Sequence, residues 1–224
     1  MKLSKDTLEV LGNFSDINQS VLFKKGKTIR TVSPAKTVLA EAKVAEEFTR
    51  EAAVYDLKQF LNYVSAFEDA DISFTEQSVK ITNGKSSGKY MYAAKENIST
   101  PPDKDIVLPS IDIEFTMNKA MFSSVQKAAS VLGLPEMILV GRGGKAFLTT
   151  SDSKNPSSHN FEYPIGEATG EYKMIFKMDN LKILPRDYKV KVSAKGIAHF
   201  VSSTGDVQYW IATESTSTFE SKSQ

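Results

Sequence analysis

The sequence contains no cysteine, which excludes disulfide bonds and thiolate chemistry and is compatible with a reducing compartment. Histidine is almost as scarce, and neither His159 nor His199 is surrounded by residues at metal-ligand spacing. A zinc site or a Ser–His–Asp arrangement needs several such side chains to converge. We therefore interpret both histidines as ordinary strand residues and predict that the protein uses no metal and no cofactor.

Long apolar runs are also absent, since none approaches the ~20 residues that a membrane helix requires. The opening residues MKLSKDTLEV lack the apolar region of a signal peptide, so we expect neither a leader nor a membrane contact. Charge of one sign does not dominate, because the net charge is +1. Any role with nucleic acid must therefore depend on where the basic residues lie, and not on their excess.

The clearest positive feature of the chain is an internal repeat. Residues 53–96 include AVYDLKQFLNYVSAF and ADISFTEQSVKITNGKSSGKYMYAAKE, and residues 174–214 include MIFKMDNLKILP and DYKVKVSAKGIAHFVSSTGDVQYWIATE. Each stretch predicts a strand that enters a short helix, followed by three strands separated by turns. Because the period is roughly half the chain, the repeat predicts a duplicated domain and not a solenoid.

The pattern predicts an α+β protein with two similar domains, each with two helices packed on antiparallel β-sheets. With 41% hydrophobic residues in a chain of 224, there are enough apolar side chains for two cores. We place the N-terminal domain at residues 1–96 and the C-terminal domain at 111–215. An extended connector with three prolines lies between them at 97–110, and a polar, disordered tail follows at 216–224.

Four helices are expected, at residues 4–14, 56–67, 118–132 and 178–184. Ser4 and Asp56 are favourable N-caps, and Pro185 stops the fourth helix. The buried stripes of the first three helices are expected to contain Leu8, Leu11 and Phe14; Leu57, Phe60, Leu61 and Val64; and Met121, Val125, Ala128 or Ala129, and Leu132.

The polar sides of the predicted helices carry five lysines, namely Lys5, Lys58, Lys119, Lys127 and Lys182. A single lysine in such a place is ordinarily a solvated surface residue, and Asp6, Glu9 and Asp179 reduce the positive charge. Lysine on all four helices nevertheless favours a surface that contacts the phosphates of duplex DNA without reading its bases.

Two glycine-rich segments resemble part of a phosphate-binding loop, at residues 84–86 (GKS) and 141–145 (GRGGK). Val79 stands where the first glycine of that motif belongs, and Ala146 follows the second segment in place of serine or threonine. Both segments lie between predicted strands, whereas the motif joins a strand to a helix. We interpret both as hairpin turns, and no pair of carboxylates stands out as an acid and a base.

The order and spacing of several short motifs resemble the sliding clamp, or DNA polymerase processivity factor, of T-even-type bacteriophages. The motifs are MKLSKDT at the start, NF followed by IN at 13–18, VYDL with FL at 54–61, and NLK, P, YK and AKG within 180–196. The resemblance covers residues 1–218. It implies the DNA clamp fold of the proliferating cell nuclear antigen, in which a homotrimeric ring encircles duplex DNA and helices line the hole.

The resemblance implies that the protein is not an enzyme but tethers the replicative DNA polymerase for processive synthesis. A clamp-loader ATPase is implied as the partner that opens the ring and places it on DNA. Other replication, repair or late-transcription proteins are implied as further partners, in the cytoplasm of the infected bacterial host cell. The five lysines become candidate DNA-facing residues. The family often has basic residues where Gly12 and Ser130 stand here, so the inner surface is expected to be less positive than usual.

By the same resemblance, partner peptides dock in an apolar pocket beside the connector, with candidate walls at Ile106, Val107, Leu108 and Pro109. An equal alternative is that these residues only seal the seam between the domains. The ring plan also implies that an edge strand at 89–94 meets an edge strand at 160–165 of the next subunit. The candidate subunit-interface residues are Tyr90, Tyr92, Phe161, Tyr163 and Ile165.

Two alternatives belong to other functional classes. One is a monomeric β-rich interaction module that does not encircle DNA, and the oligomeric mass distinguishes it from a ring. The other is a phage nucleotide-handling enzyme, which would need a convergent polar site that the sequence does not show.

Overall fold

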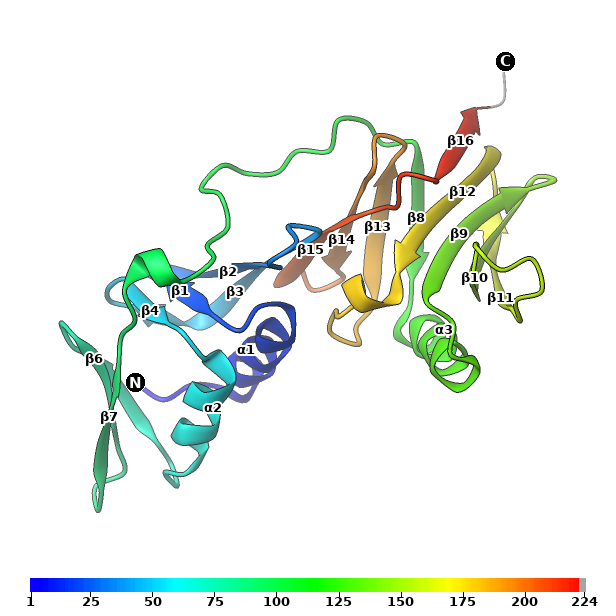
Figure 1. The fold of residues 1–224 in the computed structure, drawn as a ribbon. Coiled ribbons are helices and arrows are strands. Elements are labelled where there is room, and N and C mark those ends of the chain that lie inside the picture. The colour runs from blue at the N-terminus through cyan, green and yellow to red at the C-terminus, as the bar shows by residue number, and fades with distance from the viewer. Residues whose placement is uncertain (222–224) are drawn as a thin grey trace. The chain divides into compact units, whose positions relative to one another are not determined.

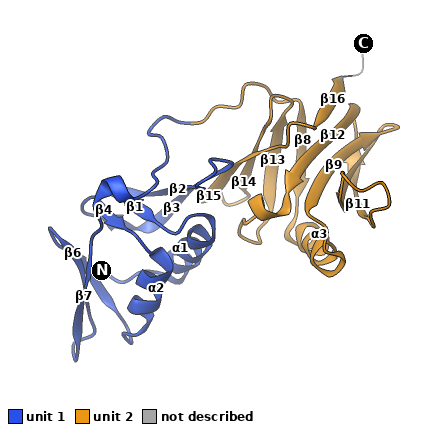
Figure 2. Cartoon of the chain, viewed as in Figure 1, with its two compact units in different colours: residues 1–105 blue, residues 106–224 orange. Residues whose placement is uncertain are grey.

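The structure, a computed structural model, describes residues 1–221 and divides into two compact units (Figures 1 and 2). Unit 1 is Met1–Asp105 and unit 2 is Ile106–Gln224. The boundary between them therefore falls inside the segment predicted to connect two domains.

The elements of unit 1 are α1 (Lys5–Ile17), β1 (Val21–Phe23), β2 (Gly26–Val32), β3 (Val38–Phe48), β4 (Ala52–Val54), α2 (Leu57–Ser65), β5 (Asp71–Phe74), β6 (Ser78–Thr82), β7 (Ser87–Met91) and the 3₁₀ turn η1 (Lys95–Asn97). Strand β1 pairs with β4, β2 pairs with β3, and β5, β6 and β7 form a meander, all antiparallel. Met1 covers the outer side of β5, because its amino group donates to the Ile72 carbonyl at 2.7 Å and its carbonyl accepts from the Ile72 N–H at 2.8 Å. Strand β7 is left as the open edge of this meander.

Helix α1 begins where the sequence predicts because Ser4 caps it. The Ser4 hydroxyl accepts a hydrogen bond from the Thr7 backbone N–H at 3.2 Å. Glu46 of β3 accepts further hydrogen bonds from the Ser4 N–H and the Thr7 hydroxyl. Partial burial raises the pKa of Glu46, but these hydrogen bonds outweigh it and lower the pKa overall. A strand carboxylate thus fixes the start of the helix.

The buried stripes of α1 and α2 match the prediction in part. In α2, Leu57, Phe60 and Val64 are buried, and Asp56 caps the helix by accepting from the Gln59 N–H at 2.8 Å. In α1, Leu8 is not in the core, because it is 38% exposed. The helix runs on to Ile17, and its stripe follows the helical spacing through Thr7, Val10, Leu11, Phe14 and Ile17.

The elements of unit 2 are β8 (Ile113–Met117), α3 (Lys119–Leu132), β9 (Glu136–Arg142), β10 (Lys145–Ser151), β11 (Phe161–Glu167), β12 (Gly170–Lys177), the 3₁₀ turn η2 (Met178–Asn180), β13 (Tyr188–Ser193), β14 (Ile197–Ser202), β15 (Val207–Ala212) and β16 (Thr218–Ser221). One sheet has the order β11-β10-β9-β12-β16, and β15, β14, β13 and β8 are neighbours in that order in another. Strands β5 to β7 and β13 to β15 are the two predicted copies of the three-strand repeat.

Residues 178–184 do not form the predicted fourth helix, because only the turn η2 is helical there. The side chains that follow η2 are buried almost without interruption, which an amphipathic helix does not allow. They are Leu181, Ile183 and Leu184. Two buried tyrosines satisfy the extended backbone, since Tyr209 accepts from the Leu184 N–H at 3.2 Å and Tyr188 donates to the Leu184 carbonyl at 2.7 Å. Unit 2 therefore has one α-helix among its described residues where two were predicted.

The polar tail is also more ordered than predicted. Residues 218–221 form β16, which pairs with β12 and places Phe219 opposite Tyr172. The two rings stack with centroids 6.2 Å apart. One aromatic residue is enough to anchor a segment whose average composition is polar, so the prediction of disorder was wrong for 218–221. The rest of the predicted tail, 222–224, lies outside the described residues.

Each unit has its own aromatic core. In unit 1, the rings of Phe23, Phe48, Phe60 and Phe74 contact one another. In unit 2, the corresponding cluster is Phe176, Tyr188, Phe200 and Tyr209. Separate cores allow each unit to fold as a domain.

Candidate functional site

Helix α3 carries two of the candidate DNA-facing lysines on its exposed side. Lys119 and Lys127 are exposed, whereas Met121, Phe122 and Val125 face the core. No acidic residue lies within the helix. Its N-terminus is capped by Asn118, and the Lys119 N–H also donates to Asp187 at 2.7 Å. Because its polar side is only positive, α3 is the helix best suited to lie against phosphates.

The C-terminal end of α3 corrects one prediction. Leu132, expected in the buried stripe, is 41% exposed, and Val131 is 75% exposed. The stripe ends at Ala129, and Gly133 then turns the chain with a φ of 64°.

Helices α1 and α2 pack against each other in unit 1, and Lys5 and Lys58 are both exposed. Lys58 is the only charged residue within α2, so this helix is weakly positive. Helix α1 differs, because its single lysine is outnumbered by acidic residues at positions 6, 9 and 16. The sequence predicts that Asp6 and Glu9 reduce the positive charge of the first helix, and the net positive charge lies in α2 and α3.

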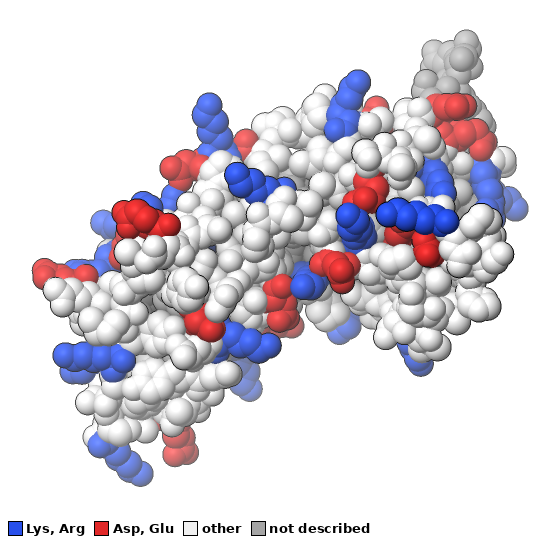
Figure 3. All heavy atoms as spheres, viewed as in Figure 1, with Lys and Arg blue, Asp and Glu red and all other residues white. Residues whose placement is uncertain are grey.

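Lys182 is exposed, but it does not lie on a helix. It follows η2, next to the buried Leu181. Basic and acidic side chains are interspersed over the face shown in Figure 3. The face drawn in Figure 3 therefore offers no continuous positive surface.

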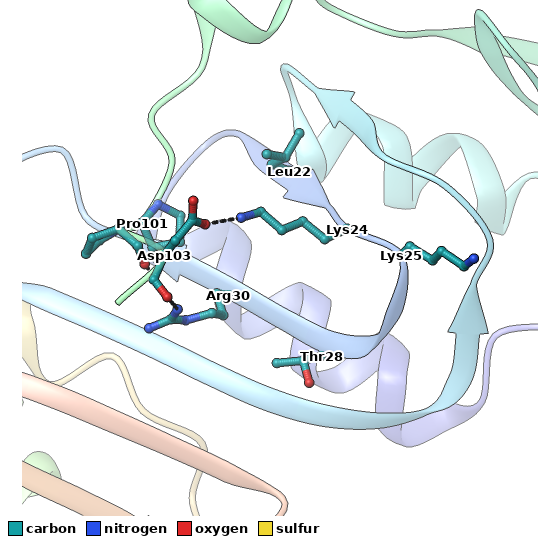
Figure 4. Close-up of a pocket in the computed structure, with 8 residues that line it drawn as sticks. Leu22, Lys24, Lys25, Thr28, Arg30, Pro101 and Asp103 are labelled. Carbon is teal, nitrogen blue, oxygen red and sulfur yellow. Dashed lines mark hydrogen bonds and ion pairs between the residues drawn. The ribbon is translucent and has the colours of Figure 1, made fainter. Parts of the chain in front are cut away.

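The connector does not lie free, because its first part closes a pocket of about 250 Å³ in unit 1 (Figure 4). The lining residues are Leu22, Lys24, Lys25, Thr28, Arg30, Pro101, Pro102 and Asp103. Arg30 donates to the carbonyl oxygens of Pro102 at 3.1 Å, Asp103 at 3.4 Å and Lys104 at 3.5 Å. Lys24 forms a hydrogen-bonded ion pair with Asp103. The hydrogen bond and the positive charge of Lys24 lower the pKa of the Asp103 carboxyl.

Sequence reasoning missed this pocket. Lys24 lies in the turn between β1 and β2, and Arg30 lies on β2. They are 79 and 72 positions before Asp103 and Pro102, the connector residues that they contact. Nothing in the local pattern of either segment links them. The candidate pocket residues lie further along, where Ile106 and Leu108 are half-buried and Val107 is 82% exposed.

The two predicted interface strands are both sheet edges. Strand β7 ends the three-stranded meander, and β11 ends the five-stranded sheet. Phe161, Tyr163 and Ile165 are half-buried on β11. Pro164 lies among them, which suits an edge because proline cannot donate to a ladder.

Tyr90 and Tyr92 are held largely within unit 1. The Tyr90 hydroxyl donates to the Asp56 carbonyl and to Gln59, each at 3.1 Å, and its ring meets that of Phe60. The Tyr92 hydroxyl donates to the Thr75 carbonyl at 3.1 Å. Burial raises the pKa of both hydroxyls. Both tyrosines are half-buried, Tyr90 on β7 and Tyr92 just after its last residue.

The segments considered for catalysis lie in ordinary structural roles. Residues 84–86 lie in the β6–β7 turn, and residues 143–144 form the β9–β10 turn between the end of β9 at Arg142 and the start of β10 at Lys145, so both segments are hairpin turns as predicted. His199 of β14 stacks on Trp210 with centroids 4.5 Å apart, whereas His159 lies in the loop before β11 and not in a strand. Across residues 1–221, no cluster of three or more His, Cys, Asp or Glu side chains could hold a metal ion. In the same residues, no helix is long and apolar enough to cross a membrane.

Comparison with known proteins agrees with this architecture. Residues 4–100 match the family model described as DNA polymerase processivity factor, and residues 114–215 match the one described as gp45 sliding clamp, C terminal. The chain is 34% identical over 221 residues to the sliding clamp of Vibrio phage KVP40, covering 96% of this chain and 99% of that protein. It is 30% identical to the sliding clamp of Escherichia phage RB69, covering 98% of this chain and 100% of that protein.

Among solved structures, the chain is similar to the proliferating cell nuclear antigen of A. fulgidus bound to the C-terminal region of FEN-1. The TM-score is 0.68 at 14% identity, with 92% of this chain and 94% of that chain covered. A likeness at this identity shows the fold. The predicted α+β clamp architecture is confirmed, apart from the second helix of unit 2.

Proposed function

Because this chain belongs to the sliding clamps of T4-like bacteriophages, the non-enzymatic processivity factors of DNA polymerases, we propose that three copies join head to tail into a ring around duplex DNA. The observation that carries the proposal is the pair of open sheet edges, β7 in unit 1 and β11 in unit 2. An exposed edge is a template for another strand, and soluble proteins cover it. Two different edges on one chain support a heterologous contact, which closes into a ring when the rotation fits.

In this ring, the exposed lysines of the helices face the DNA. Lys119 and Lys127 of α3 and Lys58 of α2 contribute most, Lys5 contributes less because α1 is acidic, and Lys182 adds charge from the segment after η2. Each lysine near a phosphate adds a salt-sensitive increment and no base preference. Modest charge suffices, because a closed ring is retained by topology and weak contacts allow sliding.

The replicative polymerase and an ATP-dependent clamp loader dock through short peptides with apolar anchors, near Ile106, Val107, Leu108 and Pro109. The exposure of Val107 beside half-buried neighbours supports a surface that a peptide covers. Other replication, repair or late-transcription proteins share this surface. The protein acts in the cytoplasm of the infected bacterial cell.

The test combines mass with processivity. Light scattering after size-exclusion should give three times the 24.7 kDa chain mass over a range of concentrations. With loader and polymerase, the clamp should extend product length on a closed circular primed template. On a linear template with free ends it should slide off, and the gain should be small. A monomeric mass at every concentration would instead support the β-rich interaction module.

A further inference from the structure

Two lysines lie opposite each other on the solvent-exposed face of the β5–β7 meander. Lys80 of β6 and Lys89 of β7 are directly opposite in the ladder, and both are exposed. Neither side chain has an ion-pair or hydrogen-bond partner among residues 1–221. Like charges directly across a ladder destabilise it, so this placement is unfavourable in the isolated chain. An anion supplied from outside would relieve it.

The face that bears these lysines is set by the strand pairing. Val79 and Ile81 of β6 are fully buried and lie opposite Tyr90 and Gly88. A Cβ added to Gly88 would lie 2.0 Å from the Tyr63 hydroxyl, so α2 covers that side. Successive strand residues point to opposite faces. Lys89 therefore points away from the core, next to the free edge of β7.

Strand β11 presents the opposite charge in the corresponding place. Phe161 and Tyr163 lie opposite Thr150 and Leu148, which are fully buried, so their side is the core side. The other side carries Glu162, Pro164 and Glu167. A register shift in the pairing with β10, between Ala146 and Phe147, accommodates the extra residue and returns Glu167 to the side of Glu162. The outer side of β11 itself is thus acidic, with Arg142 bound to Glu162 and Lys145 of β10 opposite Glu167.

Glu162 is already oriented by unit 2. Both of its carboxylate oxygens accept from Arg142 at 2.8 Å, and Arg142 lies over the Phe147 ring with 4.8 Å to the centroid. Glu167 has no described ion pair within residues 1–221 and is exposed. One carboxylate is therefore pre-positioned, and the other lies opposite Lys145 of β10 without an ion pair to it in residues 1–221.

We infer that Lys89, supported by Lys80, forms ion pairs with Glu162 and Glu167 on β11 of a second copy of this chain. The inference rests on the proposed ring, and it names the ion pairs that set the register of the two strands across the subunit joint. When β7 pairs antiparallel with β11 as a neighbouring strand, and the core-facing sides of both strands lie on the same face of the joined sheet, Lys89 and Glu162 both lie on the opposite face. Whether Lys89 stands opposite Glu162 or opposite Pro164, Glu162 is a direct or diagonal neighbour within reach of the lysine. A one-residue slip would turn Lys89 to the core side, so the charges select against it.

The experiment is a charge swap measured by assembly, without DNA. Lys89→Glu alone and Glu162→Lys alone should each raise the protein concentration at half-assembly by about tenfold, because each puts like charges together in every joint of the ring. The double variant should return to within about threefold of the parent, since it restores opposite charges. Lys85→Glu, in the turn of the same hairpin, is the matched control and should assemble as the parent does. Added salt should weaken the parent and leave Lys89→Glu less affected.

The possible outcomes distinguish a failure of the proposed ion pair from a failure of the proposed ring. If the parent is monomeric at every concentration, the proposed ring fails. If the parent is trimeric and Lys89→Glu assembles equally well, the ring stands and the ion pair is overturned. Because Glu162 also binds Arg142, Glu167→Lys is tested as a second rescue, and a Lys89→Glu defect that neither Glu162→Lys nor Glu167→Lys relieves also overturns the inference. If Lys89→Glu forms a normal trimer, a separate DNA-retention assay tests whether the lysine serves nucleic acid instead, and a loss there would assign it to DNA.

Discussion

Arg30 of β2 donates a hydrogen bond from Nη1 to the carbonyl oxygen of Pro102 at 3.1 Å, and the two residues are 72 positions apart. The same guanidinium reaches the next two carbonyls of the connector, and its Nε lies 3.2 Å from Glu41 of β3. Arg30 is only 17% exposed. A planar group with five donors is suited to several carbonyls at once, which a lysine could not match. Arg30 therefore holds residues 102–104 of the connector to unit 1, beside the contacts that Lys24 makes with Asp103 and Asn18 makes with Ser99.

Removing Arg30 should loosen residues 102–104. Arg30→Met alone would leave Glu41 half-buried without its cation, so the test variant is Arg30→Met with Glu41→Gln. We expect trypsin to cleave after Lys104 several-fold faster in this variant, with the mass of the assembly unchanged. Lys24→Met removes an ion pair between exposed partners and should have a much smaller effect. Equal cleavage rates in all three proteins would show that Arg30 does not hold the connector.

Reversing the charge of α3 should weaken DNA binding selectively. Lys119 and Lys127 lie eight residues apart, about 80° around the helix axis, on the side away from the core. Changing both to glutamate should leave folding and mass normal and reduce processive synthesis. The salt dependence of DNA retention should become shallower, by about one unit of slope for each phosphate that a lysine no longer neutralises. Lys154→Glu with Lys195→Glu changes the net charge equally in exposed turns and should behave as the parent. Undiminished processivity of the α3 variant across a salt series would mean that α3 does not face DNA.

The core side of the β11 edge should be needed for assembly. Tyr163 is half-buried on the edge strand, and an aspartate there would place a charge in the joint. We expect Tyr163→Asp to cost ~2 kcal/mol or more per joint and to shift the trimer towards monomer in analytical ultracentrifugation. Tyr55→Asp is the matched control, because Tyr55 is 55% exposed and belongs to neither edge strand. A trimeric Tyr163→Asp at low micromolar concentration would exclude β11 from the interface.

The connector residues should carry peptide affinity. Val107→Glu places a charge on an exposed apolar residue and should cost ~1–3 kcal/mol in the binding of polymerase C-terminal peptides, measured by calorimetry. The trimer should persist, because Val107 supports no core. Val131→Glu, at an equally exposed apolar position on α3, should bind the peptide normally. Unchanged affinity in Val107→Glu would favour the alternative, in which these residues only seal the seam.

The turn between β14 and β15 in unit 2 should stabilise the folded protein at neutral pH and lose this effect in acid. Burial raises the pKa of Asp206, but hydrogen bonds from Thr204, Ser202 and Arg186 outweigh it and lower the pKa to about 2. A lowered carboxyl pKa stabilises the fold fully above the unfolded value of about 3.8 and loses that effect as pH falls through about 2. The side chain is 38% exposed, so after screening the effect is about 1 kcal/mol. Asp206→Asn should lower the unfolding free energy by this amount at pH 7. The difference from the parent should shrink between pH 4 and pH 2 in denaturant titrations, and a difference constant with pH would contradict the assignment.

Much of the architecture follows from local sequence. Ser4, Asp56 and Asn118 cap the helices that follow them, because their side-chain oxygens satisfy backbone N–H groups at close range. The alternation in residues 70–92 and 187–212 predicts the two meanders, since one face of each is buried. These signals span a few residues, and a short stretch of sequence is enough to decide them. The family resemblance, the clamp fold and the processivity function followed from the order of such stretches.

Only the tertiary structure decided the features that depend on distant partners. Residues 178–184 remain extended because Tyr188 and Tyr209, further along the chain, bond to their backbone, which no helical propensity of that segment reveals. Strand β16 forms because it pairs with β12 and its Phe219 stacks on Tyr172. The connector is fixed by Arg30, and the face on which Lys89 lies is decided by its partner strand. Local sequence sets which conformation a segment prefers on its own. Burial and hydrogen bonds with residues far along the chain contribute larger free energies than these local preferences, so they decide which conformation the segment adopts in the folded protein.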